Sequence, residues 1–223
     1  MNKSFLSAAV IVLGTTLLSG CVIHVGNASA LDGNDVSTML GNINIASGKH
    51  AGDISSVNGN IDIKEHGSAA EISIVNGNLD MSSHVTVDSI DIVNGDVAAS
   101  SHLTVKRSIE TVNGDISLQA NGSVGGNIET VNGDISITDV TVNNDISTLN
   151  GDIDITGNSE IYGDIIYEHN ESNWGNDKDK LPTLTIGKNV TLHGNIILKR
   201  RVDLNIESAD IDKKVVVSYD HAK

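Results

Sequence analysis

The chain has 223 residues, of which 29 are acidic and 14 basic, so its formal net charge is -15 at pH 7. Neutralising nucleic-acid phosphates requires clustered Lys and Arg, so this acidic chain is not expected to bind nucleic acid. Its single Cys excludes a disulfide scaffold and any zinc site built from several cysteines. Aromatic residues make up only 2% of the chain, which leaves an ordinary globular core short of large side chains.

Residues 1–20 have the composition of a lipoprotein signal peptide. Lys3 supplies a positive charge, and residues 5–18 form an apolar run that is too short to cross a bilayer comfortably. The run ends in the sequence LSGC, which resembles the bacterial lipobox and contains the only Cys of the chain, Cys21. An ordinary signal peptide followed by an accidental Cys is the alternative.

The lipobox resemblance implies that the signal is cleaved and that Cys21 carries a covalent lipid. Val22 rather than Asp follows it, which in lipoproteins implies sorting to the outer membrane, facing either the periplasm or the cell surface. Several acyl chains on one residue anchor a protein far more firmly than a single chain does. We therefore expect a lipidated N-terminus and a short linker over residues 21–39, followed by an envelope-exposed domain.

One five-residue motif dominates the rest of the chain. Asn-Gly, preceded by Val or Leu and followed by Asn or Asp and an aliphatic residue, recurs at intervals of 18 or 19 residues. Its glycines are Gly59, Gly77, Gly95, Gly114, Gly133 and Gly151. Degenerate copies surround Gly41 and Gly194. Within each period, three short segments alternate apolar residues with Ser, Thr or Asp, which is the pattern of half-buried strands.

Two architectures explain Asn-Gly between such segments. Asn-Gly is a strong signal for a tight β-hairpin turn, so an antiparallel hairpin array is one of them. A constant period with three strands per copy favours the other, a single-stranded parallel β-helix (β-solenoid) with coils of 18–19 residues. We predict this all-β fold over residues 40–167, with about eight or nine coils in a rod about 40 Å long. Columns of β-branched residues would fill its core without aromatic side chains.

The V-N-G-D-I copies behind a lipobox resemble the bacterial β-strand-repeat lipoproteins that are often labelled adhesins. More distantly, they are similar to the bactofilins, which are polymer-forming scaffolds. The resemblance covers roughly residues 40–200 and implies a right-handed coil. It also implies a non-enzymatic role in surface contact, adhesin-like or structural, with an envelope protein or polysaccharide as partner and with self-association.

Stacking turns each repeat position into a column that runs along the rod. The motif Asn residues form one column, in which each amide can bond to its neighbours along the axis and hold the corner. Its members are Asn58, Asn76, Asn94, Asn113, Asn132 and Asn150. We expect a structural role for this ladder, and positive φ at the glycines that follow it.

A second column carries carboxylates directly after the motif glycines. Its acidic members are Asp96, Asp115, Asp134 and Asp152. They form either a solvated acidic face or a set of oxygen ligands for Ca²⁺. The chain lacks the Gly-rich nonapeptide of calcium-binding β-rolls, and one carboxylate per coil is few for this ion.

A third column carries imidazoles, seven residues after the motif glycines. His66, His84 and His102 are expected to stack about 5 Å apart. Such a ladder is an exposed polar column, a transition-metal site or a pH-sensitive patch.

The C-terminal third departs from the repeat. Residues 168–181 form a polar insertion with the only Trp, Trp174, which either contacts a partner or packs back against the rod. We expect residues 182–223 to form the last coils and a cap, because an open coil end exposes unpaired strand edges. Basic residues at 199–201 and 213–214 could protect those edges.

Sequence motifs of catalysis are absent: the chain has no nucleophile elbow, phosphate-binding loop, dinucleotide fingerprint or HExxH helix. We therefore do not expect an enzyme, nor any cofactor beyond the lipid on Cys21 and a candidate Ca²⁺. Two alternative functions stay open. One is a calcium- or transition-metal-responsive binding protein that uses the Asp or His column, and the other is a carbohydrate-active enzyme.

Overall fold

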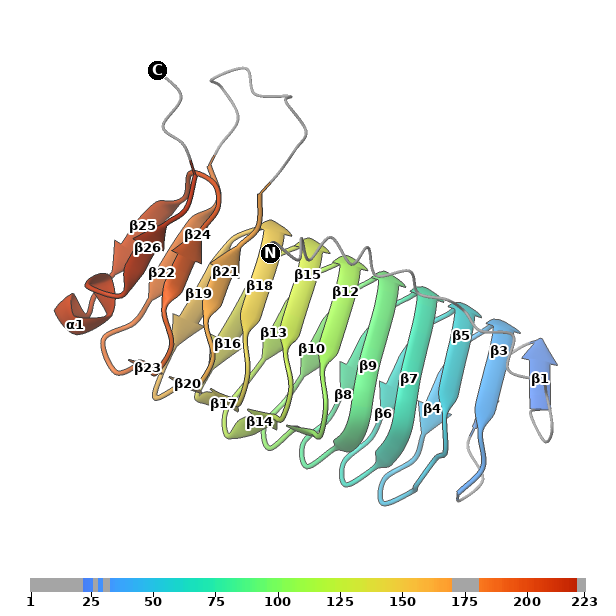
Figure 1. Ribbon diagram of the computed structural model, residues 1–223. Helices are drawn as coiled ribbons and strands as arrows, with labels where there is room; N and C mark the ends of the chain where they lie inside the picture. Colours follow the sequence, from blue (N-terminus) through green and yellow to red (C-terminus); the bar gives the residue numbers. More distant parts are fainter. Residues whose placement is uncertain (1–21, 26–27, 30–32, 170–180, 220–223) are drawn as a thin grey trace.

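The computed structural model describes residues 22–25, 28–29, 33–169 and 181–219. It is a parallel β-solenoid of about nine turns (Figure 1). Strands of neighbouring turns pair in parallel throughout, so the predicted all-β solenoid is confirmed and the hairpin array is excluded.

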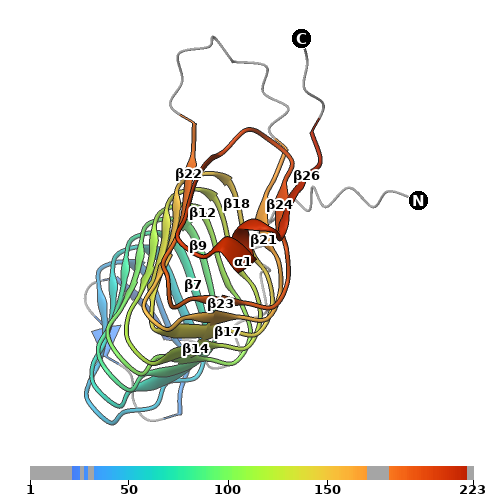
Figure 2. The ribbon, with the colours of Figure 1, turned by 90° about the vertical axis from the view of Figure 1, so that its left-hand side faces the viewer.

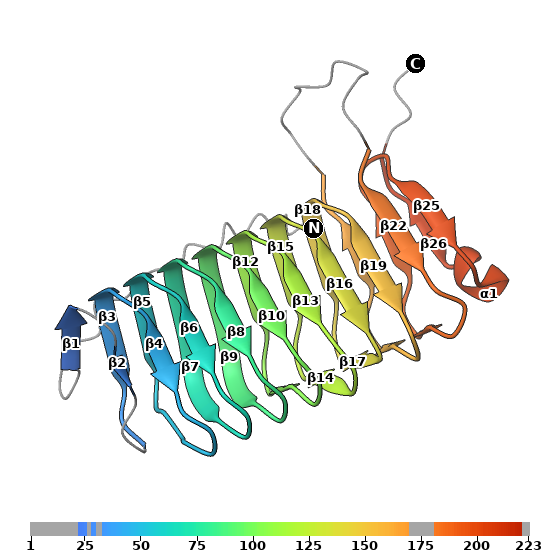
Figure 3. The same cartoon turned by 180° about the vertical axis from the view of Figure 1, so that it is seen from behind.

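Most turns contribute strands to three faces, which we call face 1, face 2 and face 3 in chain order, although the first turns have no strand on face 3 and the last turn carries α1 there. Face 1 contains β1 (Val22–Val25), β3 (Val36–Leu40), β5 (Ile54–Asn58), β7 (Ser68–Asn76), β9 (Thr86–Asn94), β12 (Ile109–Asn113), β15 (Ile128–Asn132), β18 (Ile146–Asn150), β21 (Ile165–Tyr167), β24 (Ile196–Leu198) and β26 (Val215–Val217). Face 2, seen best in Figure 3, contains β2 (Ala28–Ser29), β4 (Ile43–Ile45), β6 (Ile61–Ile63), β8 (Leu79–Met81), β10 (Val97–Ala99), β13 (Ile116–Leu118), β16 (Ile135–Thr138), β19 (Ile153–Thr156), β22 (Thr183–Ile186) and β25 (Asp203–Ile206). Face 3 contains β11 (Thr104–Val105), β14 (Gly122–Val124), β17 (Val140–Val142), β20 (Glu160–Ile161) and β23 (Thr191–Leu192). The long strands β7 and β9 turn the corner from face 3 into face 1, because their first halves pair along face 3.

The coil is right-handed. Figure 2 views the rod from its C-terminal end, and there the chain runs from β22 on the left, through β23 at the bottom, to β24 on the right. This anticlockwise path toward the viewer defines a right-handed coil, the hand that connections between parallel strands strongly prefer.

The core consists of columns of aliphatic side chains that point inward from each face. Residues in register, such as Ile116, Ile135 and Ile153, lie above one another and are fully buried. Tyr167 is the exception, because it brings an aromatic ring into the core where the regular turns end. Its hydroxyl donates a hydrogen bond to the backbone oxygen of Thr183 at 3.0 Å, and burial raises the pKa of the phenol well above its ordinary value.

Close approach between turns explains the motif glycines. A Cβ on Gly114 or Gly133 would lie 1.9 or 2.0 Å from the backbone oxygen of the preceding motif glycine. Gly77 and Gly95 have φ values of 152° and 149°, as expected, but Gly114 and Gly133 do not have positive φ. The expectation of positive φ is therefore wrong for the later turns. Glycine is required there because no side chain fits between consecutive corners.

The stacked strands extend beyond the expected boundaries. β1 pairs with β3 and β2 pairs with β4, so residues 22–25 and 28–29 already belong to the rod and not to a linker. At the other end, β25, β26 and the short helix α1 (Ala209–Asp212) form the last turn. Ile211 of α1 is only 4% exposed and covers the end of the core.

Candidate functional site

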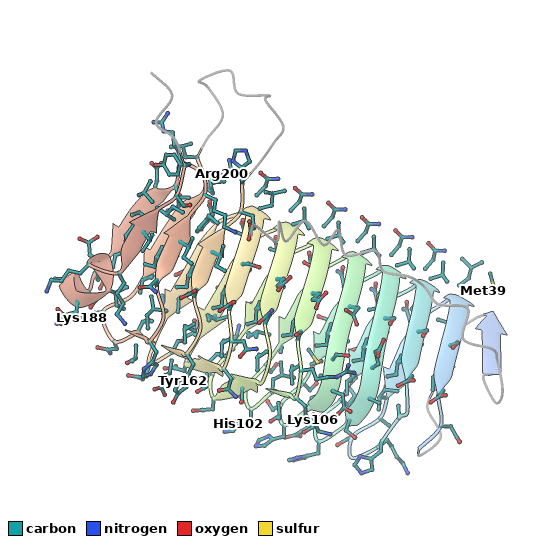
Figure 4. All side chains as sticks on the ribbon, in the orientation of Figure 1. Met39, His102, Lys106, Tyr162, Lys188 and Arg200 are labelled. Carbon is teal, nitrogen blue, oxygen red and sulfur yellow. The ribbon has the colours of Figure 1, made fainter. Side chains whose placement is uncertain are left out.

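The corner between faces 1 and 2 carries the Asn ladder. Each Asn Nδ2 donates to the Oδ1 of the Asn one turn earlier, at distances of 2.9–3.1 Å, from Asn150 back to Asn58. The ladder therefore has a direction, with its last acceptor at Asn150. There Arg200 Nη1 donates to Asn150 Oδ1 at 2.6 Å and to the Leu149 backbone oxygen at 2.7 Å. Arg200, on the upper edge of the rod in Figure 4, thus caps the ladder where the next turn offers no Asn.

The carboxylates of the Asp column also join consecutive turns. Asp96 Oδ1 accepts the backbone N–H of Asp115 at 2.9 Å, and the same contact repeats at 2.8 Å from Asp134 to Asp115 and at 2.7 Å from Asp152 to Asp134. Asp152 Oδ1 in turn accepts the N–H of Thr183 at 2.7 Å. One oxygen of each carboxylate is therefore committed to the backbone. Ca²⁺ requires six to eight oxygen ligands, and this column supplies one carboxylate per turn.

His66, His84 and His102 form the corner between faces 2 and 3. Their φ values of 58°, 61° and 60° lie in the left-handed region. Four other turns place Gly48, Asn121, Asp139 and Gly157 at this position, again with positive φ. Asn, Asp and His are the side-chain-bearing residues most enriched in this conformation. Sequence analysis did not identify this corner, although the alternation of His with Gly, Asn and Asp in one register signals it.

The three imidazoles stack along the edge of the rod, and all three are exposed. The ring centroids of His66 and His84 are 4.7 Å apart with planes tilted by 32°, and those of His84 and His102 are 4.4 Å apart and nearly parallel at 6°. Glu65 Oε1 lies 3.8 Å from His66 Nε2. Within the described residues, Glu65, His66 and His84 are the only group of three potential metal-ligating side chains with donor atoms within 4.8 Å of one another.

A second aromatic cluster, which sequence analysis missed, lies where face 3 meets face 1 near the C-terminal end. Tyr162 and His193 stack with centroids 4.5 Å apart and planes at 6°, and His193 Nε2 lies 2.8 Å from Glu160 Oε1. Hydrogen bonds from His193 and then Tyr162 hold the pKa of Glu160 below its ordinary value. His193 follows the insertion, so its distance from Tyr162 in the chain obscures the shared register.

An acidic column runs along the outer side of face 1, with Asp91, Glu110 and Glu129 in register on neighbouring strands. Partial burial, and next the charge of Glu129, raise the pKa of Glu110. Partial burial and then Glu71 raise the pKa of Asp91, which Arg107 lowers in part. These carboxylates therefore repel one another in the folded rod.

Cys21 and Trp174, the expected lipidation site and partner contact, lie outside the described residues. Across the described part of the chain, no helix has the length and apolar character needed to pass through a bilayer. No family model matches the chain, and neither does any curated protein or any solved structure.

Proposed function

We propose that the protein is a lipid-anchored lipoprotein of the bacterial outer membrane whose solenoid acts by surface contact, as an adhesin-like or scaffolding rod, and not by catalysis. The regular outer surface is the observation that carries this proposal. Each turn presents an outward-facing residue at the same place, so the faces are long strips with a repeat of one strand spacing, about 4.8 Å. Repeat proteins use such extended surfaces to contact extended partners.

The chemistry of the strips favours a partner with repeating polar groups. The outer column of face 2 carries, in register, Asp62, Asp80, Ala98, Ser117 and Ser136, with a shallow open hollow at Ala98 and Ala99. Hydroxyl and carboxylate groups on neighbouring strands suit hydrogen bonding to an envelope polysaccharide or to the edge of an envelope protein. The net charge of -15 disfavours an anionic partner.

The anchor is tested by producing the full chain and its Cys21→Ser variant in a Gram-negative host. We expect the wild type in the outer-membrane fraction, with an N-terminal peptide whose mass includes the acyl chains. The Cys21→Ser variant should leave that fraction. A wild-type chain that is secreted without lipid would contradict the anchor, whatever the rod binds.

A second candidate function is end-to-end assembly of the rod. β25 and β26 are the last strands of their faces, and their side chains Leu204, Val216 and Val217 are 40%, 48% and 48% exposed. Open strand edges that carry apolar side chains promote pairing with another chain. Sedimentation velocity should then show growth with concentration that Val216→Lys abolishes, while the exposed-site control Lys188→Glu leaves it unchanged. A monomer at all concentrations would exclude this assembly.

A further inference from the structure

The backbone conformation at His66, His84 and His102 does not by itself require histidine. Gly48, Asn121, Asp139 and Gly157 satisfy the same left-handed position in other turns, with φ between 54° and 68°. Gly or Asn would therefore suffice for the backbone at His66, His84 and His102. Three consecutive imidazoles 4.4–4.7 Å apart would also repel one another when protonated. What they add over Gly or Asn is a set of ring nitrogens on one exposed edge.

Ring orientation distinguishes the two neighbouring pairs. The lone pair of an imidazole nitrogen lies in the ring plane, so two parallel stacked rings aim their lone pairs in parallel and must rotate further than tilted rings to share an ion. His84 and His102 have this arrangement, with planes at 6°. The ring of His66 is tilted by 32° from that of His84. This tilt turns the lone pairs of the two rings toward a common point, where one ion could bind both.

Glu65 supplies a third ligand beside the tilted pair. Donor atoms of Glu65, His66 and His84 lie within 4.8 Å of one another, and Glu65 Oε1 is 3.8 Å from His66 Nε2. Around a tetrahedral ion with bonds of about 2.0 Å, ligand atoms are about 3.3 Å apart. The side chains of His66 and Glu65 are 60% and 59% exposed, so rotation about their side-chain bonds can close the difference without moving the rod. The nearby cation Lys64 is paired with Asp62 at 2.7 Å.

We propose that Glu65, His66 and His84 form an exposed binding site for a divalent transition-metal ion such as Zn²⁺, Cu²⁺ or Ni²⁺. Imidazole suits these ions, whereas Ca²⁺ and Mg²⁺ prefer oxygen ligands. Three protein ligands leave a coordination position for water or for a group from a partner. His102 is not a ligand, and its ring only stacks in parallel on that of His84. The site is independent of the lipid anchor and of the contact surface proposed above.

The test is isothermal titration of ZnCl₂ into the full chain in detergent, in a Cys21→Ser background so that the only thiol cannot contribute. We expect one ion per chain. His66→Asn and His84→Asn should each weaken binding at least about tenfold, the lower end of what loss of even an outer-shell partner costs. Asn keeps the left-handed corner, as Asn121 does in the same column, so these variants should retain the circular dichroism of the parent. Glu65→Gln, which leaves the corner untouched, should also weaken binding.

His102→Asn is the matched control, and its affinity should stay close to that of the parent. Imidazole NMR signals of His66 and His84 should shift on Zn²⁺ addition. Absence of saturable binding at millimolar Zn²⁺ would overturn the site, as would equal affinity in His84→Asn and the parent. If His102→Asn weakens binding as much as His84→Asn does, the assignment to Glu65, His66 and His84 is wrong.

Discussion

The regular turns over residues 33–169 and the C-terminal turns over residues 181–219 share one coil but satisfy their polar groups and cover their core in different ways. In the regular turns, corner residues contact the equivalent residue one turn away, as the Asn94 side chain does with that of Asn76. Near the C-terminal end the identical partner is missing, and different residues replace it. Arg200 takes the place of the next Asn, and Ile211 of α1 covers the open core. Adding a turn to a ladder therefore only repeats an existing contact, whereas the end of the ladder requires residues of a different kind.

Gly114→Ala should break the regular turns most severely. The added Cβ would lie 1.9 Å from the backbone oxygen of Gly95, which cannot move without displacing a whole turn. We expect the free energy of unfolding in urea to fall by about 3–5 kcal/mol. Gly48→Ala is the control, because its Cβ meets nothing within 4 Å and only the left-handed φ of +68° opposes it, at about 1–2 kcal/mol. Equal losses in the two variants would contradict the steric explanation.

Arg200→Met should expose the end of the Asn ladder. Met keeps an unbranched apolar side chain but removes the hydrogen bonds to Asn150 and Leu149. We expect a loss of about 1–3 kcal/mol, with faster amide hydrogen exchange concentrated in β18 and β21. The same substitution at the exposed neighbour Arg201 should change little. If both variants unfold alike, Arg200 does not act as a cap.

Tyr167→Phe should affect the C-terminal turns more mildly. The ring still fills the core, but the hydrogen bond to the Thr183 oxygen is lost, at a cost of about 1 kcal/mol. Thermal unfolding followed by circular dichroism measures the difference. Tyr162→Phe, which removes a surface hydroxyl and its hydrogen bond to Glu160 from a residue that is 48% exposed, is the comparison. If Tyr162→Phe lowered the melting temperature more than Tyr167→Phe did, the buried Tyr167 hydroxyl would not contribute the expected stability.

Glu110→Gln should stabilise the regular turns slightly, by about 0.5 kcal/mol, because it removes a partly buried charge and its repulsion by like charges on neighbouring strands. The pKa of Glu110 is raised above 4.5 in the folded state. The ionised carboxylate therefore lowers the stability of the fold at pH values above this raised pKa. That unfavourable contribution disappears as the pH falls through the raised value toward 4.5. The gain from Gln, measured by urea unfolding, should therefore shrink at low pH and at high salt. A gain that is unchanged at pH 4 would contradict this origin.

Sequence analysis correctly predicted the solenoid, the three strands per coil and the columns at the motif corners. The reason is that a fixed period with Asn-Gly at each copy is a local signal that repeats, so errors in single copies are averaged out. It set the start of the rod too late, because the first strands lack the motif and their pairing partners identify them only in space. It took the segment around Gly194 for a degenerate copy of the Asn-Gly motif, whereas Gly194 lies against Gly163 and His193 stacks on Tyr162, at the corner between faces 3 and 1. The insertion hides this register in the sequence.

The sequence by itself determined the coil, since the period and the alternation of apolar residues depend on neighbours within one turn. It also specified which residues meet in the Asn, Asp and His columns, because parallel stacking without shift aligns equal positions of successive copies. Only the tertiary structure decided how those columns behave. The left-handed corner at the His residues, the tilt that separates one imidazole pair from the other, and the capping of Asn150 by Arg200 50 residues away all depend on contacts between turns. Such contacts depend on the direction of each ladder and on the turn at which it ends. The sequence of a single repeat determines neither.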